Sequence, residues 1–376
     1  MLDTLWEEFW WNHITGAQVV VSKVTSLLLD NAMVILKVPS DLPWRHAMRG
    51  SIHAAFQQRS DFEDVVIELI DAIDDNQENL VPGRFVLQRF ASSTVSRGYR
   101  EKSRITVQQY IMQKDVIKNR IIWIKGLTGK TAEEWVDFCK GFAPRTVTDG
   151  LFVLEIHGNM NVTATKYIQT INYSDSVSNY DVQLFNSFVL DGEGTYSNSW
   201  KKYIAVMAAL ICDIDVEVSE RLLRETDFRK EEPIKGIQRI SKLPEFKYRG
   251  LEADSAHVLW YYQNGYISEI KHRVWAAQVQ ILFPIIEFER ESIIRKWEAL
   301  IKAALEEEET KQYGEIIKEP IDVELGTLCY MMARENGVLY IPDENARRRI
   351  RFLHECRNLL AHASCCTSEQ VSELLR

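Results

Sequence analysis

The feature that most constrains the fold is an alternation of short apolar runs and longer amphipathic segments in the first half of the chain. Each run is short enough to be a buried strand, and the segments between them carry apolar residues at helical spacing. This pattern predicts a mostly parallel sheet of about five strands flanked by helices. The predicted strands are Ala32–Val38, Arg84–Phe90, Ile121–Ile124, Leu151–Ile156 and Val182–Leu190, and the predicted helices are Trp44–Arg59, Phe62–Ile73 and Ala132–Phe142.

The pattern becomes helical from Asn198 onward, so the predicted fold class is α/β followed by all-α, with a helical C-terminal bundle. The basic segment Arg229–Arg249 is broken by Pro233 and Pro244 and is predicted to be a linker or an exposed basic segment. The predicted helices are Trp200–Cys212, Val216–Arg224, Ala256–Tyr262, Ile267–Phe283, Ile285–Glu309, Val323–Glu335 and Glu344–Ala363.

Four parts follow from these patterns. Residues 1–30 form an N-terminal helical segment, because Trp6, Phe9 and Trp10 recur at helical spacing. Residues 31–195 form the α/β domain, residues 196–255 a helical linker region, and residues 256–376 a C-terminal helical domain.

Composition narrows the class of protein. The chain has 376 residues, a hydrophobic fraction of 46% and a formal net charge of −9, which argues against general coating of nucleic acid. Its first residues do not resemble a signal peptide, and no apolar stretch is long enough to span a bilayer. The six cysteines lack CxxC spacing and are predicted to be reduced thiols. We therefore expect a cytoplasmic protein without a membrane partner.

The order of elements in the first half resembles P-loop NTPases of the AAA and STAND type. The residues that such enzymes use are missing, because Pro39–Ser51 after the first strand contains one glycine and no Gly-Lys-Ser/Thr. Gly129-Lys130-Thr131 lies between a strand and a helix, but the leading glycine of a P-loop would fall at Ile124. The resemblance implies a degenerate NTPase-like domain, in which Arg45, Lys130 and Thr131 are the candidate nucleotide-binding residues.

Two polar residues end the fourth predicted strand. Open α/β sheets bind ligands at the carboxyl ends of their strands, where Glu155 and His157 are expected to lie. The pair has two interpretations, an acid–base pair or a strand end whose polar groups satisfy each other.

The last predicted helix begins after Asp343, a suitable N-cap. Its apolar residues Ile350, Leu353, Cys356 and Leu360 form one stripe. A second line of the helix carries polar residues, and Arg357 lies one position before that line. The polar line consists of Arg351, Glu355, Asn358 and His362.

The segment Arg357–His362 resembles the Arg-x(4–6)-His motif of HEPN-type helical domains, and Trp275–Arg295 and Glu324–Met332 resemble their earlier helices. The resemblance implies metal-independent RNA cleavage with the 2′-OH as nucleophile. His362 would be the general base or acid, Arg357 would stabilise charge on the phosphate, and Asn358 would orient His362. Such a site implies a homodimer, and Arg347, Arg348 and Arg349 would hold the RNA backbone.

Two other interpretations of the same helix remain open. Asn358 and His362 could cap the helix end in a domain that only binds or packs. Thiol and imidazole groups could also hold zinc, although their spacing matches no common site. The residues of that alternative are His354, Cys356, His362, Cys365 and Cys366.

The leading hypothesis is a non-catalytic interaction or scaffold subunit of a prokaryotic multi-protein system, with anti-phage defence as the setting that the combined resemblance implies. Its protein partners would be encoded nearby, and no cofactor or metal is expected. The alternatives are a HEPN-type RNase effector triggered through the α/β domain and an ATP-binding regulatory protein.

Overall fold

The computed structural model describes residues 3–58, 64–72, 81–100, 104–157, 164–249, 256–307, 309–312, 314–333 and 338–376. The chain forms two compact units, Met1–Phe185 and Asn186–Arg376, here called unit 1 and unit 2. Each unit has its own core and is described by itself.

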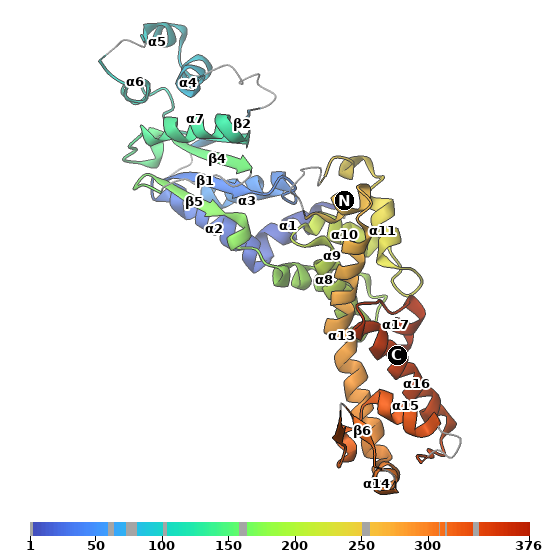
Figure 1. Ribbon diagram of the computed structural model, residues 1–376. Coiled ribbons are helices and arrows are strands. Elements are labelled where there is room, and N and C mark those ends of the chain that lie inside the picture. Colours follow the sequence, from blue (N-terminus) through green and yellow to red (C-terminus); the bar gives the residue numbers. More distant parts are fainter. Residues whose placement is uncertain are drawn as a thin grey trace. The chain divides into compact units, whose positions relative to one another are not determined.

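Unit 1 contains the parallel sheet that the alternation predicts (Figure 1). The strand order is β2-β3-β4-β1-β5, and every neighbouring pair is parallel. The central strands are buried along nearly their whole length, as expected for a sheet covered on both faces. The strands are β1 (Met33–Val38), β2 (Val66–Asp71), β3 (Arg120–Leu127), β4 (Leu151–His157) and β5 (Ile168–Asn172).

Helices cover both faces because the crossovers run in opposite directions across the sheet. The connection through α3 leads from β1 to the edge strand β2, whereas the connection through α7 leads back from β3 to β4. Right-handed crossovers therefore place α3 and α7 on opposite faces. The helices are α1 (Asp3–His13), α2 (Thr15–Leu29), α3 (Arg45–Gln57), α4 (Pro82–Phe90), α5 (Ser93–Gly98), α6 (Val107–Gln113), α7 (Gly129–Lys140) and α8 (Asn179–Glu193), which continues into unit 2.

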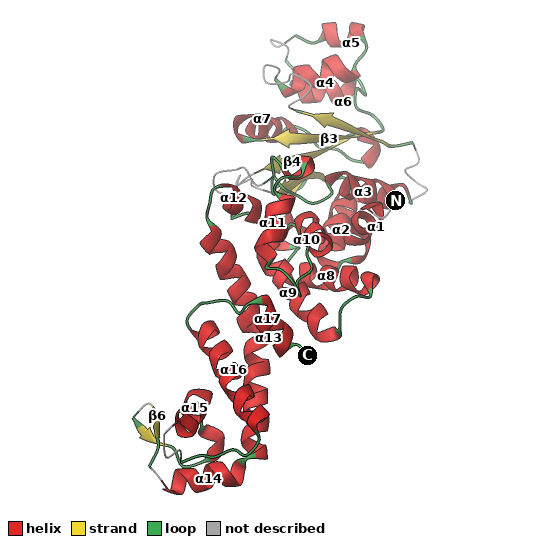
Figure 2. Cartoon of the chain, turned by 90° about the vertical axis from the view of Figure 1, so that its right-hand side faces the viewer, coloured by secondary structure: helices red, strands yellow, loops and turns green. Residues whose placement is uncertain are grey.

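Unit 2 is mainly helical (Figure 2) and contains a small hairpin of β6 (Lys311–Gln312) and β7 (Glu315–Ile316). The long helix α13 packs against α9 and α16. A hydrogen bond from Trp275 Nε1 to the Leu360 carbonyl, 2.7 Å, joins α13 to α16. The helices are α9 (Asn198–Cys212), α10 (Val216–Glu225), α11 (Pro233–Ile240), α12 (Val258–Gln263), α13 (Ile267–Lys296), α14 (Glu298–Glu307), α15 (Leu325–Ala333), α16 (Glu344–Ala361) and α17 (Ser368–Leu374).

The fold class is confirmed, but several individual elements differ from their predictions. The predicted helix Phe62–Ile73 is strand β2 where it is described; Phe62, Glu63 and Ile73 lie outside the described residues. The predicted strand Arg84–Phe90 is helix α4, which begins at Pro82. The predicted strand Val182–Leu190 belongs to helix α8, and the fifth strand is instead Ile168–Asn172.

One prediction in unit 2 is also wrong. Pro284 does not divide two helices, because α13 continues through it and ends at Lys296. Pro284 is exposed, so the carbonyl that its ring leaves without a partner can turn to solvent. The segment Arg229–Arg249 lies in the predicted helical linker region and contains helix α11, which has Pro233 in its first turn, where proline is favourable. Within the described residues, no helix is both long and apolar enough to cross a membrane.

Candidate functional site

The polar residues of unit 1 gather where β1 and β4 end. The two strands are neighbours in register, with Leu36 opposite Glu155 and Val38 opposite His157. Helix α3 follows β1 and presents Arg45 and Arg49, four residues apart, on one face. Met48, Ile52 and Phe56 are the buried apolar residues of the same helix.

Glu155 is the centre of this arrangement. Its carboxylate is fully buried and accepts hydrogen bonds from Arg49 Nε and Nη2 at 3.0–3.1 Å and from Arg45 Nη1 at 3.1 Å. Trp123 Nε1 on β3 donates a further bond of 3.0 Å. We call Arg45, Arg49, Trp123, Glu155 and His157 the sheet-edge cluster. The buried charge is thus paired and hydrogen-bonded, which is the condition for its stability in a core.

Arg45 links the cluster to the loop after β1. Its Nη2 donates to the carbonyls of Pro39 (2.7 Å) and Ser40 (2.6 Å). Its Nη1 also lies 3.0 Å from His157 Nε2, and because a guanidinium only donates, this nitrogen must accept. Burial and the nearby Arg45 charge lower the pKa of His157. His157 is therefore a neutral acceptor in this cluster.

The second nucleotide-binding candidate lies apart from this cluster. Gly129 begins α7 with a φ of +46°, and the Lys130 amine pairs with Glu134 on the next turn, at 3.6 Å. The Lys130 side chain is 87% exposed. Among the residues that the structure describes, no contact joins Lys130 or Thr131 to Arg45. The three predicted residues therefore do not converge on one phosphate position.

The Arg-Asn-x-x-x-His motif lies on the last turns of α16. The Arg357 guanidinium pairs with Glu324, just before α15, at 3.2 Å. Asn358 Nδ2 lies 2.9 Å from His354 Nε2, one turn earlier on α16. His362 is the C-cap residue and is exposed. The Asn358 side chain therefore bonds to His354 rather than to the His362 ring, whereas the Asn358 backbone carbonyl accepts from the His362 N–H at 3.0 Å.

Acidic neighbours account for two of the three arginines near the start of α16. Arg348 pairs with Glu344, and Arg349 binds Glu289 on α13 through two bonds of 2.6 and 2.7 Å. The hydrogen bond to Glu289 raises the pKa of Arg349 further. Arg347 donates to the carbonyls of Ile341 and Pro342. The contacts of Arg347 and Arg349 tie α16 to neighbouring segments of unit 2, whereas the pair Arg348–Glu344 lies within α16.

The residues of the zinc alternative point in different directions. His354 binds Asn358, and the Cys365 thiol donates to the Lys271 carbonyl at 3.5 Å. The thiols of Cys356 and Cys366 lie together in the core, where Cys366 also donates to the Cys356 carbonyl. The structure thus separates this set into a thiol pair, an exposed His362 and a loop cysteine.

The sequence places Glu155 and His157 at a strand end, but it gives Trp123, which donates to Glu155, only as part of an apolar run. Glu324, the partner of Arg357, stands out in the sequence only as part of a predicted helix. The spacing of Arg45 and Arg49, one helical turn apart after a strand, is a signal that could have paired them with the strand-end acid.

Comparisons with known proteins add little to this geometry. No family model and no curated protein matches the chain. Among solved structures, it shows a likeness to a chain in the structure of Drosophila ORC bound to GC-rich DNA and Cdc6, with 9% identity and a TM-score of 0.23. The match covers 98% of this chain and 72% of that chain. A TM-score this low does not establish a shared fold, so the proposals below rest on the side chains described above.

Proposed function

We propose that this protein is a non-catalytic interaction subunit of a prokaryotic multi-protein system, such as anti-phage defence. In this proposal a degenerate NTPase-like sheet is joined to a HEPN-like helical domain, and the protein acts through partners encoded nearby. The observation that supports it most is the sheet-edge cluster. The two arginines that could face a phosphate after β1 are held by Glu155.

The energetics of this pairing argue against phosphate transfer. A nucleotide that recruited Arg45 and Arg49 would leave the Glu155 carboxylate buried without its charge partners. Removing one partner of a buried ion pair costs on the order of 3–5 kcal/mol. A phosphate-binding loop normally supplies backbone N–H groups and a lysine instead, and Lys130 lies outside the cluster.

The tail motif supports the same proposal. Arg357 bonds to Glu324 and so holds α16 against the segment before α15, whereas the bond from Asn358 to His354 lies within α16 itself. An orienting role for Asn358 toward His362 would require it to exchange its partner. The motif therefore fits a packing role better than a preformed catalytic site.

Co-purification is the direct test of the interaction role. The tagged chain would be expressed from its own locus together with the neighbouring genes, and the purified complex would be identified by mass spectrometry and sized by light scattering. We expect stoichiometric recovery of at least one neighbour's product. A chain that is recovered alone and monomeric under these conditions would contradict the proposal.

Nucleotide binding is tested separately by thermal shift with Mg-ATP. We expect no change in the melting temperature of the natural chain or of Lys130→Ala. A clear rise in the natural chain that is absent in Lys130→Ala would support the ATP-binding alternative and overturn the degenerate-scaffold proposal.

One observation favours a second candidate, an RNase effector. His362 is exposed at the end of α16, where a second copy of the helix could approach it. Labelled RNA would be incubated with the protein and EDTA over a range of protein concentrations. Cleavage that rises with dimerisation, is lost in His362→Ala and persists in His272→Ala, another exposed histidine, would establish this activity. Absence of cleavage at every concentration would exclude it.

A further inference from the structure

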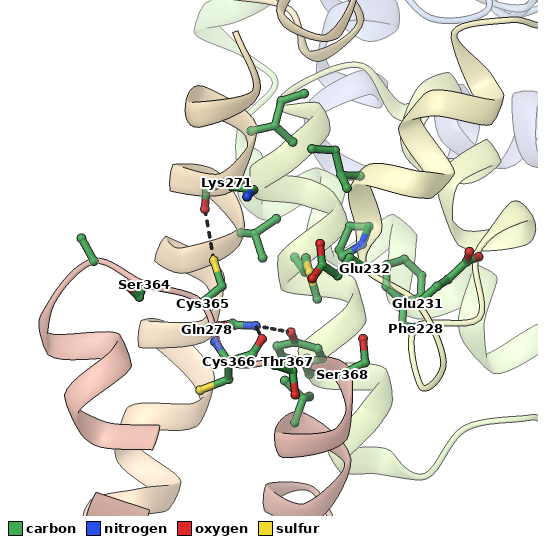
Figure 3. A pocket seen from close by; sticks show the side chains of 18 residues that line it. Phe228, Glu231, Glu232, Lys271, Gln278, Ser364, Cys365, Cys366, Thr367 and Ser368 are labelled. Carbon is green, nitrogen blue, oxygen red and sulfur yellow. Dashed lines mark hydrogen bonds between the residues drawn. The ribbon is translucent and has the colours of Figure 1, made fainter. Parts of the chain in front are cut away.

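Unit 2 contains a cavity that none of the functions above uses (Figure 3). Its volume is about 340 Å³. It is enclosed by α9, the segment that leads into α11, α13, and the segment 363–368 between α16 and α17. Sites for small ligands are usually of this size and combine apolar walls with a few polar groups.

The walls of the cavity are mainly apolar. Phe228, Ile270 and Val371 are nearly fully buried side chains that line it from three different segments. Val274 adds to the wall on α13, one turn after Ile270. An apolar group of a ligand that displaced water from these walls would bind favourably, because apolar surface would be buried.

The polar floor is already satisfied by the protein. Gln278 is 2% exposed, and its amide nitrogen donates to Tyr203 Oη (3.2 Å) and to the Cys366 carbonyl (3.1 Å). Its oxygen accepts from the Cys366 N–H at 2.7 Å. The floor is therefore fixed, and ligand recognition is left to the groups at the rim.

Two opposite charges stand at that rim. Figure 3 shows Lys271 on α13 and Glu232 on the segment before α11, on opposite sides of the hollow. Neither forms an ion pair within the part of the chain that the structure describes. The adjacent Glu231 is different, because Arg239 holds its carboxylate at 3.0 Å.

Cys365 lies near both charges. Burial raises the pKa of its thiol, Glu232 raises it further, and Lys271 lowers it. Both charges therefore act on the same small space. The thiol itself stays neutral at physiological pH and adds no charge of its own.

We propose that this cavity binds a small zwitterion with an apolar side chain, that is, a free amino acid of the leucine or phenylalanine type. Glu232 would receive the ammonium group, Lys271 the carboxylate, and the apolar walls the side chain. One water occupies ~30 Å³ of liquid, so the cavity holds on the order of ten non-hydrogen atoms. A bound ligand would fix the segment 363–368, which directly follows His362, against α13.

The proposal is tested by titrating the full chain with L-leucine and with two analogues in a calorimeter. 4-Methylpentanoate keeps the carboxylate but lacks the amine, and 3-methylbutylamine keeps the amine but lacks the carboxylate. We expect L-leucine to bind at least tenfold more tightly than either analogue, since each lost charge contact weakens binding by about tenfold.

Variants assign the two charges. Glu232→Gln is expected to weaken the binding of L-leucine about tenfold and to leave the binding of 4-methylpentanoate unchanged. Lys271→Gln is expected to weaken the binding of L-leucine by the same factor and to leave the binding of 3-methylbutylamine unchanged. Both side chains are exposed at the rim, so the variants should fold. Lys235→Gln, an exposed change on α11 outside the cavity lining, is the matched control and should bind as the natural chain does.

A second readout uses the thiols and does not depend on partners or RNA. Saturating L-leucine should slow alkylation of Cys365 by iodoacetamide several-fold and leave Cys329, which lies on α15, unaffected. Equal binding of the two analogues and L-leucine, or no protection of Cys365 at tens of millimolar L-leucine, would overturn the proposal. The interaction function would stand in either case, because its test is co-purification.

Discussion

At the scale of single residues, Glu155 carries the largest predicted effect on stability. Glu155→Gln keeps the side-chain volume but removes the charge that faces two guanidinium groups. We expect the free energy of unfolding to fall by about 3 kcal/mol. Urea unfolding followed by circular dichroism measures this change.

The control for that prediction is an exposed ion pair in the same unit. Glu134→Gln removes the partner of Lys130 on the surface of α7 and should cost less than about 0.5 kcal/mol. If the free energy of unfolding of Glu155→Gln falls by less than about 1 kcal/mol, then water hydrates the two guanidinium groups as favourably as the carboxylate pairs with them.

His157 gives unit 1 a predicted pH dependence. Its pKa is lowered in the folded chain by burial and by Arg45, whereas the unfolded value is about 6.5. As the pH falls below about 6.5, the unfolded chain takes up a proton that the folded chain refuses, so stability declines. Urea titrations between pH 5.5 and 7.5 should show a smaller decline in His157→Gln than in the natural chain.

An exposed histidine supplies the comparison for this measurement. His13→Gln changes a side chain at the end of α1 that lies on the surface. Its pH profile should follow that of the natural chain. If His157→Gln and His13→Gln have the same slope, the lowered pKa of His157 does not contribute to stability.

The sequence predicted part of this site for a simple reason. Glu155 and His157 end a run of apolar residues, so their place at the carboxyl edge of the sheet follows from the strand itself. The spacing of Arg45 and Arg49 is a local signal that the two arginines share one face of a helix, but which strand end that face meets depends on how α3 crosses back over the sheet. The hydrogen bond from Trp123 to Glu155 joins residues 32 positions apart, so it too depends on the tertiary fold.

At the scale of elements, the errors came from segments whose local patterns are ambiguous. Val182, Phe185 and Val189 are buried at spacings of three and four, so the segment is helical despite its β-branched content. Strand β2 lies at a sheet edge, where Val66 and Leu69 remain exposed, so burial leaves no clear period of two. Apolar runs of this length do not by themselves separate a strand from a buried helix.

Helix α13 makes a testable exception to the rule that proline ends a helix. Pro284 lies in its interior and is exposed, so the helix lacks one backbone hydrogen bond on its solvent side. Pro284→Ala restores this donor without opening a cavity. We expect the free energy of unfolding to rise by about 1–3 kcal/mol, measured by urea unfolding.

The matched change is Pro233→Ala in the first turn of α11. Proline is favourable there, because the N–H that it lacks has no partner within the helix. This variant should gain nothing. Destabilisation by Pro284→Ala would show instead that a bend at this position is needed for the packing of α13 against α16.

At the scale of the whole molecule, the six cysteines report on the two cores separately. Cys139 is buried in unit 1, and Cys212, Cys356 and Cys366 are buried in unit 2. We expect iodoacetamide to modify only Cys329 and Cys365 in the native chain, since only these two thiols are partly exposed. Peptide mass spectrometry measures the extent at each site.

The rate of that modification should rise steeply between pH 7 and pH 9. Burial raises the pKa of both Cys329 and Cys365, so the reactive thiolate is scarce at neutral pH. Rapid alkylation of Cys139 or Cys212 in the native chain would contradict the burial of those two thiols.

Alkylation of the cysteines also shows which unit a single substitution destabilises. The sheet-edge cluster lies wholly within unit 1, so the destabilisation by Glu155→Gln should first expose Cys139. At a urea concentration just below the unfolding midpoint, Cys139 should become reactive while Cys212 and Cys356 stay protected. Glu134→Gln should leave all three protected. Equal exposure of the cysteines in both units would mean that the two cores unfold as one cooperative structure.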